Sequence, residues 1–344
     1  MKITHTINDC RQELFGIAAI MVVACHAKYD WTGYPRLIHK LCQHGNVGVD
    51  IFLLLSGMGL YYSMSRDGDV RSFYGRRLNR ILPTFLLIGW PLYLIRGVIG
   101  GDTVTELFLH LSTLDFWVLG RNGTATWYVS FILLLYLAYP FLHRPLSGSR
   151  WVMGFLLVNA IVFAVNGLMA VFCEDFFLNY WEMGQTRIPV FLVGMIMGRR
   201  EMAGKANRTW MAAASLLAFL VVYRIYDMAT GGYGTGTGRL LYRFSMIFLA
   251  LFISFFVCIC NDWIPDNILR RAFLAIGSVS LELYLSHALL KGVFSRSGLQ
   301  QSHNTPLYYL LYVVLPAMVI SFAAKRKISI YDKKKICYNR KRNI

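Results

Sequence analysis

Ten apolar runs, most of them about 17–23 residues long, divide this chain of 344 residues. They lie near residues 13–29, 47–65, 82–100, 126–143, 150–172, 187–199, 210–228, 240–259, 270–292 and 306–323. In lipid, backbone N–H and C=O groups must bond within their own segment, so runs of this length have to be helices. Hydrophobic residues make up 56% of the chain and charged residues 15%, a balance that excludes an ordinary soluble enzyme. The sequence therefore predicts an all-α, polytopic integral membrane protein with about ten transmembrane helices.

Lysine and arginine residues set the orientation of these helices, because they are retained on the cytoplasmic side. With a cytoplasmic N-terminus, the inner segments would hold 24 of the 35 Lys and Arg residues and the outer loops six. This bias predicts an even number of spans and two cytoplasmic termini. Residues 10–325 then form the membrane domain and 326–344 a basic cytoplasmic tail. Attraction to anionic lipid explains the tail, so no nucleic-acid partner is expected.

One segment outside the ten runs is amphipathic. Residues 104–118 carry Glu106, His110 and Asp115 among apolar side chains. This pattern predicts a short helix lying at the membrane interface rather than an eleventh span. The seven cysteines have no CxxC pair and no metal-ligand spacing, so no metal site is expected.

Four ionisable residues interrupt the apolar runs at one depth. In the predicted topology His26, Asp50, Arg187 and His287 all fall in the outer half of the membrane, although they come from four helices. Ionisable groups at this depth are costly and usually line a cavity with a function. A histidine base, an orienting carboxylate and a cation would suit a reaction chamber. Taken singly, Asp50 could be a helix cap, and His287 a hydrogen-bonded interior histidine.

A second cluster of charge lies where the second and third runs meet the cytoplasm. Arg76, Arg77 and Arg80 are spaced so that one helix face can carry their guanidinium groups, and Pro83 follows. The cluster is either an ordinary cytoplasmic anchor or a clamp for the phosphates of a donor such as coenzyme A. At the outer start of the fourth run, Trp127 and Tyr128 are either interfacial belt residues or stacking partners for a sugar.

In order along the chain, these segments resemble the acyltransferase-3 family of bacterial integral membrane acyltransferases. The resembling segments are 11–26, 48–57, 74–83, 127–140, 187–194 and 280–287. The family commonly has an arginine eleven residues before its catalytic histidine, whereas this chain has Phe15 there. Arg11 stands one helical turn earlier, on the same face, and could supply a similar cation.

The resemblance implies an enzyme that moves an acyl group, most often acetyl, from cytoplasmic acyl-CoA to a sugar hydroxyl. The acceptor would be a cell-surface or exported polysaccharide, or its lipid-linked precursor, in a bacterial inner membrane, and no tightly bound cofactor is expected. It implies that His26 is catalytic, as general base or acyl carrier. We expect Asp50 to orient an imidazole, Arg187 and Arg11 to stabilise oxyanion charge, and His287 to join them. Trp127, Tyr128 and Glu182 are expected to contact the acceptor.

Two other functions stay open at this point. A transporter or flippase for a lipid-linked sugar or small anion would also have polar groups inside ten spans. An inverted repeat would favour transport, and none is evident in the sequence. A non-catalytic partner in envelope assembly is the other alternative, and it would tolerate replacement of His26.

Overall fold

The computed structural model describes residues 5–27, 33–120, 126–204, 207–229, 233–263, 267–299 and 305–342, with side chains up to 330. Helices and connecting turns account for all of the described part, which contains no strand. The helices are α1 (Arg11–Cys25), α2 (Arg36–Gln43), η1 (His44–Asn46), α3 (Val47–Asp67), α4 (Val70–Thr84), η2 (Phe85–Gly89), α5 (Trp90–Gly100), α6 (Val104–Leu111), α7 (Asp115–Val118), α8 (Trp127–Ser147) and α9 (Trp151–Phe172). They continue with α10 (Glu174–Phe176), η4 (Phe177–Trp181), α11 (Glu182–Gln185), α12 (Ile188–Met202), α13 (Arg208–Ala229), α14 (Gly236–Trp263), α15 (Ile268–Ser278), α16 (Ser280–Arg296), α18 (Pro306–Tyr309), η5 (Leu310–Val314) and α19 (Leu315–Arg342). The all-α prediction is confirmed.

Seven helical stretches in the described part are long and apolar enough to cross a membrane, or up to eight if a bent pair counts as one span. That pair is α15 and α16, which meet at 73°. The predicted count of ten is not confirmed, because two of the expected runs form helices of only 15 residues, α1 and α12. Both lie inside the molecule, with most side chains buried by other helices. The chain is a multi-pass membrane protein.

The expected interfacial helix over 104–118 is two short helices instead. Between α6 and α7, Thr113 has a φ of 64°, in the left-handed region that breaks a right-handed helix. Thr103 and Glu106 form a capping box at the start of α6. The segment therefore folds back on itself and brings His110 and Asp115 together, which a single straight helix would not do.

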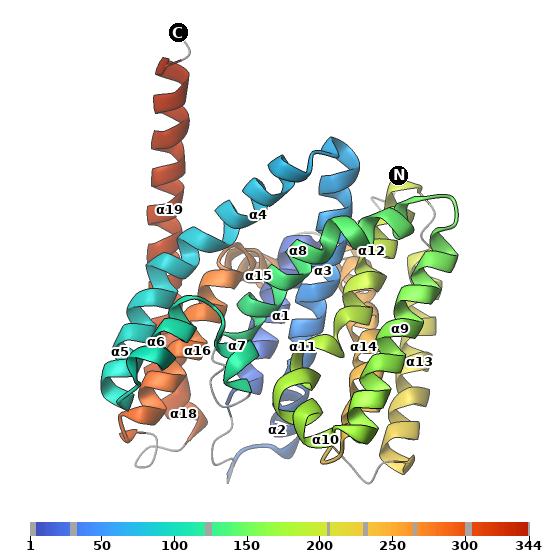
Figure 1. Cartoon of the computed structure of the whole chain (residues 1–344), viewed down its shortest axis with the longest axis horizontal. Coiled ribbons are helices and arrows are strands. Elements are labelled where there is room, and N and C mark those ends of the chain that lie inside the picture. Colours follow the sequence, from blue (N-terminus) through green and yellow to red (C-terminus); the bar gives the residue numbers. More distant parts are fainter. Residues whose placement is uncertain are drawn as a thin grey trace.

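Glycines allow the central helices to pack closely. Gly57 of α3 lies against the Phe191 backbone of α12, and Gly194 of α12 lies against the Leu54 backbone of α3. Gly16 and Gly277 bring α1 and α15 equally close. Small residues at such crossings let helix backbones approach where lipid gives no hydrophobic drive for association. Figure 1 shows α1 and α3 in the middle, with α5, α16 and α19 on one side and α9, α13 and α14 on the other.

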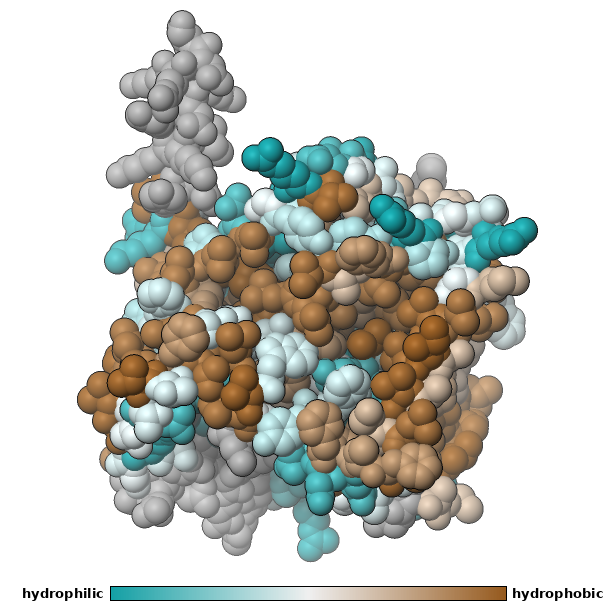
Figure 2. Space-filling model, in the orientation of Figure 1, coloured by the Kyte–Doolittle hydropathy of each residue, from teal (hydrophilic) through white to brown (hydrophobic). Residues whose placement is uncertain are grey.

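The surface agrees with a membrane location. Figure 2 shows a broad hydrophobic band around the visible face, with hydrophilic side chains gathered at the two ends. In the most apolar 18-residue stretch of α9, only 11% is buried inside the protein. Apolar side chains of this kind face outward because lipid surrounds them.

Candidate active site

A cavity of about 780 Å³ opens among the ends of α1, α13, α14 and α16. Its walls are rich in aromatic rings and contain two arginines and three histidines. The lining residues are Val22, Ala24, Cys25, His26, Ala27, His39, Cys42, Gln43, His44, Asn46, Val49, Trp127, Met183, Arg187, Tyr223, Tyr226, Tyr233, Tyr242, Arg243 and Tyr284. Pockets of 300–1,000 Å³ are typical of small-ligand sites, so this cavity, which we call the large cavity, has the size of a substrate site.

Two histidines form a hydrogen-bonded pair at this cavity. His26, at the end of α1, lies with Nδ1 2.8 Å from Nε2 of His287 on α16. Nδ1 of His287 lies 2.8 Å from the Leu283 carbonyl oxygen, which can only accept, so this nitrogen carries the proton. Nε2 of neutral His287 is then an acceptor, and His26 donates from Nδ1. The pair therefore fixes the His26 tautomer and leaves a lone pair on its Nε2.

Asp50 pairs with Arg187, not with an imidazole as we had expected. Its Oδ1 lies 3.2 Å from Arg187 Nε, and both side chains are nearly fully buried. The imidazole of His26 is instead hydrogen-bonded to His287. Asp50 is also not an N-cap, because it lies inside the first turn of α3, where Asn46 is the capping position. Its burial in the membrane requires a cationic partner, and Arg187 is the nearest.

Arg187 reaches the large cavity with its guanidinium group against Trp127. Its Cζ lies 5.1 Å from the centroid of the Trp127 ring, a cation–π contact, and an Nη1 hydrogen bond ties it to the Met183 carbonyl. Trp127 is 8% exposed, so it faces the protein interior rather than a lipid interface. Tyr128 points elsewhere and lines a second, smaller cavity.

Glu182 lies behind the cavity wall rather than on it. It is fully buried and forms ion pairs with Arg243 at 2.7 Å and Arg239 at 3.4 Å. Arg243 does line the cavity, and its Nη2 donates to the Tyr233 hydroxyl at 2.7 Å. The sequence interpretation did not select Arg243. Its position inside the apolar run 240–259 was the signal that would have identified it.

The second cavity, of about 40 Å³, lies on the other side of Tyr284. We call it the small cavity, and its lining residues are Phe15, Phe52, Ser56, Arg80, Ile81, Tyr128, Ile132, Tyr136, Ser280, Leu281 and Tyr284. Tyr284 lines both cavities, and its hydroxyl accepts from the Tyr128 backbone N–H at 3.2 Å. The large cavity with His26 and the small cavity with Arg80 therefore adjoin at this one tyrosine.

The arginine cluster is divided between two directions. The Arg76 side chain does not point along the predicted common face. It is exposed, and its Nη1 pairs with Asp67 at 2.5 Å. Arg80 and Arg11 both lie against the Phe15 ring, with Cζ 5.7 Å and 5.3 Å from its centroid. Arg11 also donates to the Leu55 carbonyl at 3.1 Å.

Arg77 turns inward as well, over the Phe73 ring. Phe15, which stands where the family has arginine, thus contacts the guanidinium groups of Arg11 and Arg80. A cationic patch of Arg11, Arg77 and Arg80 remains beside the small cavity.

Two polar networks hold the ends of these helices. In the first, Arg96 donates to His110 at 2.7 Å, and His110 contacts Asp115 at 3.0 Å. Tyr93 joins Asp115 to Thr126, the residue directly before α8. The start of α8, which carries the cavity tryptophan, is therefore fixed by buried hydrogen bonds.

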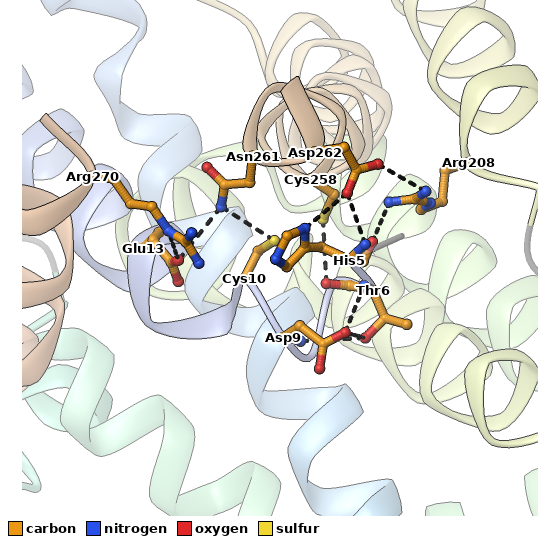
Figure 3. A network of polar contacts seen from close by, with 10 residues as sticks. All are labelled: His5, Thr6, Asp9, Cys10, Glu13, Arg208, Cys258, Asn261, Asp262 and Arg270. Atoms are coloured by element: carbon orange, nitrogen blue, oxygen red, sulfur yellow. Dashed lines mark hydrogen bonds and ion pairs between the residues drawn. The ribbon is translucent and has the colours of Figure 1, made fainter. Parts of the chain in front are cut away.

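The second network ties the N-terminal segment to the helices around it (Figure 3). His5 and Arg208 both bind the Asp262 carboxylate, at 2.8 Å and 3.0 Å. Arg270 binds Glu13 at 2.9 Å near the start of α1. These contacts link α1 to α13, α14 and α15 and so hold the helix that presents both Arg11 and His26.

No group of three or more His, Cys, Asp or Glu residues in the described ranges is arranged to hold a metal ion.

Comparison with known proteins agrees with this chemistry. The family model described as an acyltransferase domain, that of the acyltransferase-3 family, matches residues 16–326. The putative acetyltransferase ORF330 of Acidianus two-tailed virus is 23% identical over 295 residues, covering 83% of this chain and 84% of that protein. The acyltransferase MdmB of Streptomyces mycarofaciens is 27% identical over 146 residues, 37% of each chain. No solved structure matches. With its family model extending over most of its length, the chain belongs to the acyltransferase-3 family and is a membrane acyltransferase.

Proposed function

We propose that this enzyme transfers an acetyl group from cytoplasmic acyl-CoA to a sugar hydroxyl. The acceptor is a cell-surface or exported polysaccharide or its lipid-linked precursor, and the enzyme lies in a bacterial cytoplasmic membrane. One observation carries the proposal: a histidine with a fixed tautomer faces a substrate-sized cavity that adjoins a cavity beside an arginine patch. A relative named a putative acetyltransferase supports acetyl as the group transferred.

The large cavity suits a sugar acceptor. Tyr223, Tyr226, Tyr233, Tyr242 and Trp127 give it flat apolar faces, against which the C–H face of a pyranose ring packs. Tyrosine hydroxyls and the Asn46 side chain supply hydrogen bonds at the edges, because Tyr242 donates to Asn46 at 3.0 Å on the cavity wall. In the predicted orientation this cavity is on the outer side.

The arginine patch suits the donor. Arg11, Arg77 and Arg80 gather at the small cavity, whose wall contains Arg80 and the Phe15 ring that Arg11 contacts. Guanidinium groups bind phosphate oxygens through paired, charge-assisted hydrogen bonds. With the phosphates of acyl-CoA on this patch, the thioester arm is directed toward Tyr284 and His26.

His26 then acts as a general base. Its Nε2 takes the proton of the sugar hydroxyl as the oxygen attacks the thioester carbonyl, and the proton passes to the departing CoA sulfur. Arg187 stabilises the negative charge that develops on the carbonyl oxygen. His287 accepts the hydrogen bond from Nδ1 of His26 throughout and so keeps Nε2 of His26 directed at the acceptor. Transfer through an acyl-histidine would use the same Nε2 as nucleophile.

The test is the ester-linked acetyl content of surface polysaccharide, measured by NMR in a deletion strain. The strain is complemented with the parent protein, His26→Ala, or the double variant Arg77→Ala/Arg80→Ala, at equal membrane abundance. We expect one defined acetyl signal to disappear in both variants and to persist with Arg224→Ala, whose exposed side chain pairs only with Asp227 among the contacts described. Unchanged acetylation on deletion, together with substrate uptake without CoA release, would instead support transport.

A further inference from the structure

Arg243, which lines the large cavity, has a buried guanidinium nitrogen without a hydrogen-bond partner in the described part of the chain. Its side chain is 5% exposed, and its Nη1 has no hydrogen-bond partner among the described residues. Nε of the same guanidinium binds Glu182 and Nη2 binds the Tyr233 hydroxyl, so the group is rigidly held. A buried guanidinium N–H without a partner costs free energy unless something in the cavity accepts its hydrogen bond.

The charge around this wall favours an anion as that acceptor. Arg187, Arg239 and Arg243 share the two carboxylates Asp50 and Glu182, so one positive charge in this cluster is not compensated. Both carboxylates lie behind the wall, and no Asp or Glu is among the described residues that line the cavity. A neutral sugar would leave this charge buried and unpaired, which is strongly unfavourable in a membrane interior.

We propose that the acceptor carries an anionic group, a carboxylate or a phosphate on the sugar, and that Arg243 binds it. The proposal rests on the acyl transfer proposed above and names the acceptor class for the same cavity. An oxyanion can accept a charge-assisted hydrogen bond from Nη1 of Arg243, the nitrogen that Glu182 and Tyr233 leave over. The sugar ring then packs on the tyrosines beside Arg243, with a free hydroxyl toward His26. Both a uronic acid and a sugar phosphate have this shared chemistry.

Binding is measured directly on the purified full-length protein in detergent, as the shift of its thermal unfolding midpoint. The anionic probes are D-glucuronate and D-glucose 1-phosphate, and the matched neutral probes are D-glucose and methyl D-glucuronate. We expect at least one anionic probe to stabilise the parent protein in a saturable way and the neutral probes to give no shift. The probe that stabilises identifies the source of the anion, carboxylate or phosphate.

Arg243→Gln is expected to weaken binding of the anionic probe at least about tenfold, because a charge-assisted hydrogen bond and the net charge are both lost. Since this variant removes the shorter of the two ion pairs of Glu182, the double variant Glu182→Gln/Arg243→Gln provides the same test with a neutral pair. Arg224→Gln, a change of the same charge at an exposed position, should bind like the parent.

Equal stabilisation by neutral and anionic sugars would overturn the proposal, as would full anion affinity in both Arg243 variants or no shift with either anion. His26→Ala separates this inference from the acyl transfer itself. The variant should lose transfer and keep anion binding. Anion binding by a protein that acetylates no acceptor would refute the proposed function alone, whereas acetylation of neutral sugars without anion preference would refute the acceptor class alone.

Discussion

Replacing His287 with phenylalanine tests the tautomer argument directly. The change keeps a ring of similar size at a position that is fully buried, and it removes both ring nitrogens. The His26 Nδ1–H then loses the acceptor that it has at 2.8 Å. His26 must then either keep the proton on Nδ1 without an acceptor or carry it on Nε2. A protonated Nε2 cannot serve as the base.

The expected loss follows from that single hydrogen bond. Leaving a fully buried donor without a partner costs about 1–3 kcal/mol, and this is the upper range for the half-buried His26. At 1.36 kcal/mol for each factor of ten in rate, this corresponds to a decrease in kcat of about 5- to 150-fold. The KM for acetyl-CoA should stay near the parent value, because His287 does not touch the small cavity or the arginine patch. Acetyl transfer in membrane vesicles, followed as CoA release and as label incorporated into glycan, gives both constants.

Two further variants complete this experiment. His287→Gln should recover part of the lost rate, since its amide can donate to the Leu283 carbonyl and accept from His26 with the same polarity as the neutral imidazole. His143→Phe is the matched control, because His143 is a half-buried histidine of α8 that packs on Tyr61 and Tyr139. Parent-like kcat in His287→Phe at equal abundance would refute the tautomer argument, and a change confined to KM would assign His287 to donor binding instead.

The remaining predictions concern the donor site and the helix crossings. Arg77→Ala/Arg80→Ala should raise the KM for acetyl-CoA at least about tenfold, since each charge-assisted phosphate contact contributes about 1.5–3 kcal/mol. Arg76→Ala should have little effect on this KM, because the Arg76 side chain is exposed and paired with Asp67. Equal changes of KM in initial-rate assays would contradict the separation of Arg76 from Arg77 and Arg80. Gly57→Ala should destabilise the protein by about 1–3 kcal/mol, because its Cβ would overlap the backbone of α12, whereas Gly167→Ala, with open space around its Cβ, should not lower the unfolding midpoint in detergent. Equal midpoints for the two glycine variants would show that the crossing is not tightly packed.

The fold was predictable from the sequence as far as hydrophobicity determines it. Long apolar runs became helices, because a backbone in lipid has no other way to satisfy its hydrogen bonds. The number of spans was harder to predict, since α1 and α12 are buried by other helices and need not match the membrane thickness. The turn at Thr113 was missed because a threonine in the left-handed region carries no sequence signal.

In the site, the sequence predicted a depth for each polar group but not its direction around the helix. Depth alone placed His26 and His287 in one layer, and the structure joins them. The same depth was compatible with Asp50 beside either a histidine or Arg187, and only helix rotation decides between them. The arginine cluster shows the same limit, because the helix-face argument considered α4 alone. Arg76 pairs with Asp67 at the end of α3 and therefore does not share a face with Arg77 and Arg80.

The shortness of α1 has a consequence for the proposed reaction. Its 15 residues rise about 22 Å, which is less than the hydrocarbon thickness of about 30 Å. Arg11 at one end and His26 at the other therefore lie closer together than the two faces of the membrane. A donor held by its phosphates near Arg11 reaches the histidine without crossing the whole bilayer, and an acceptor enters the large cavity from the other side to meet it. Arg11 and His26 are fifteen positions apart on this one helix, so only about 22 Å separates them, and in the proposed reaction one base can serve substrates that arrive from opposite sides.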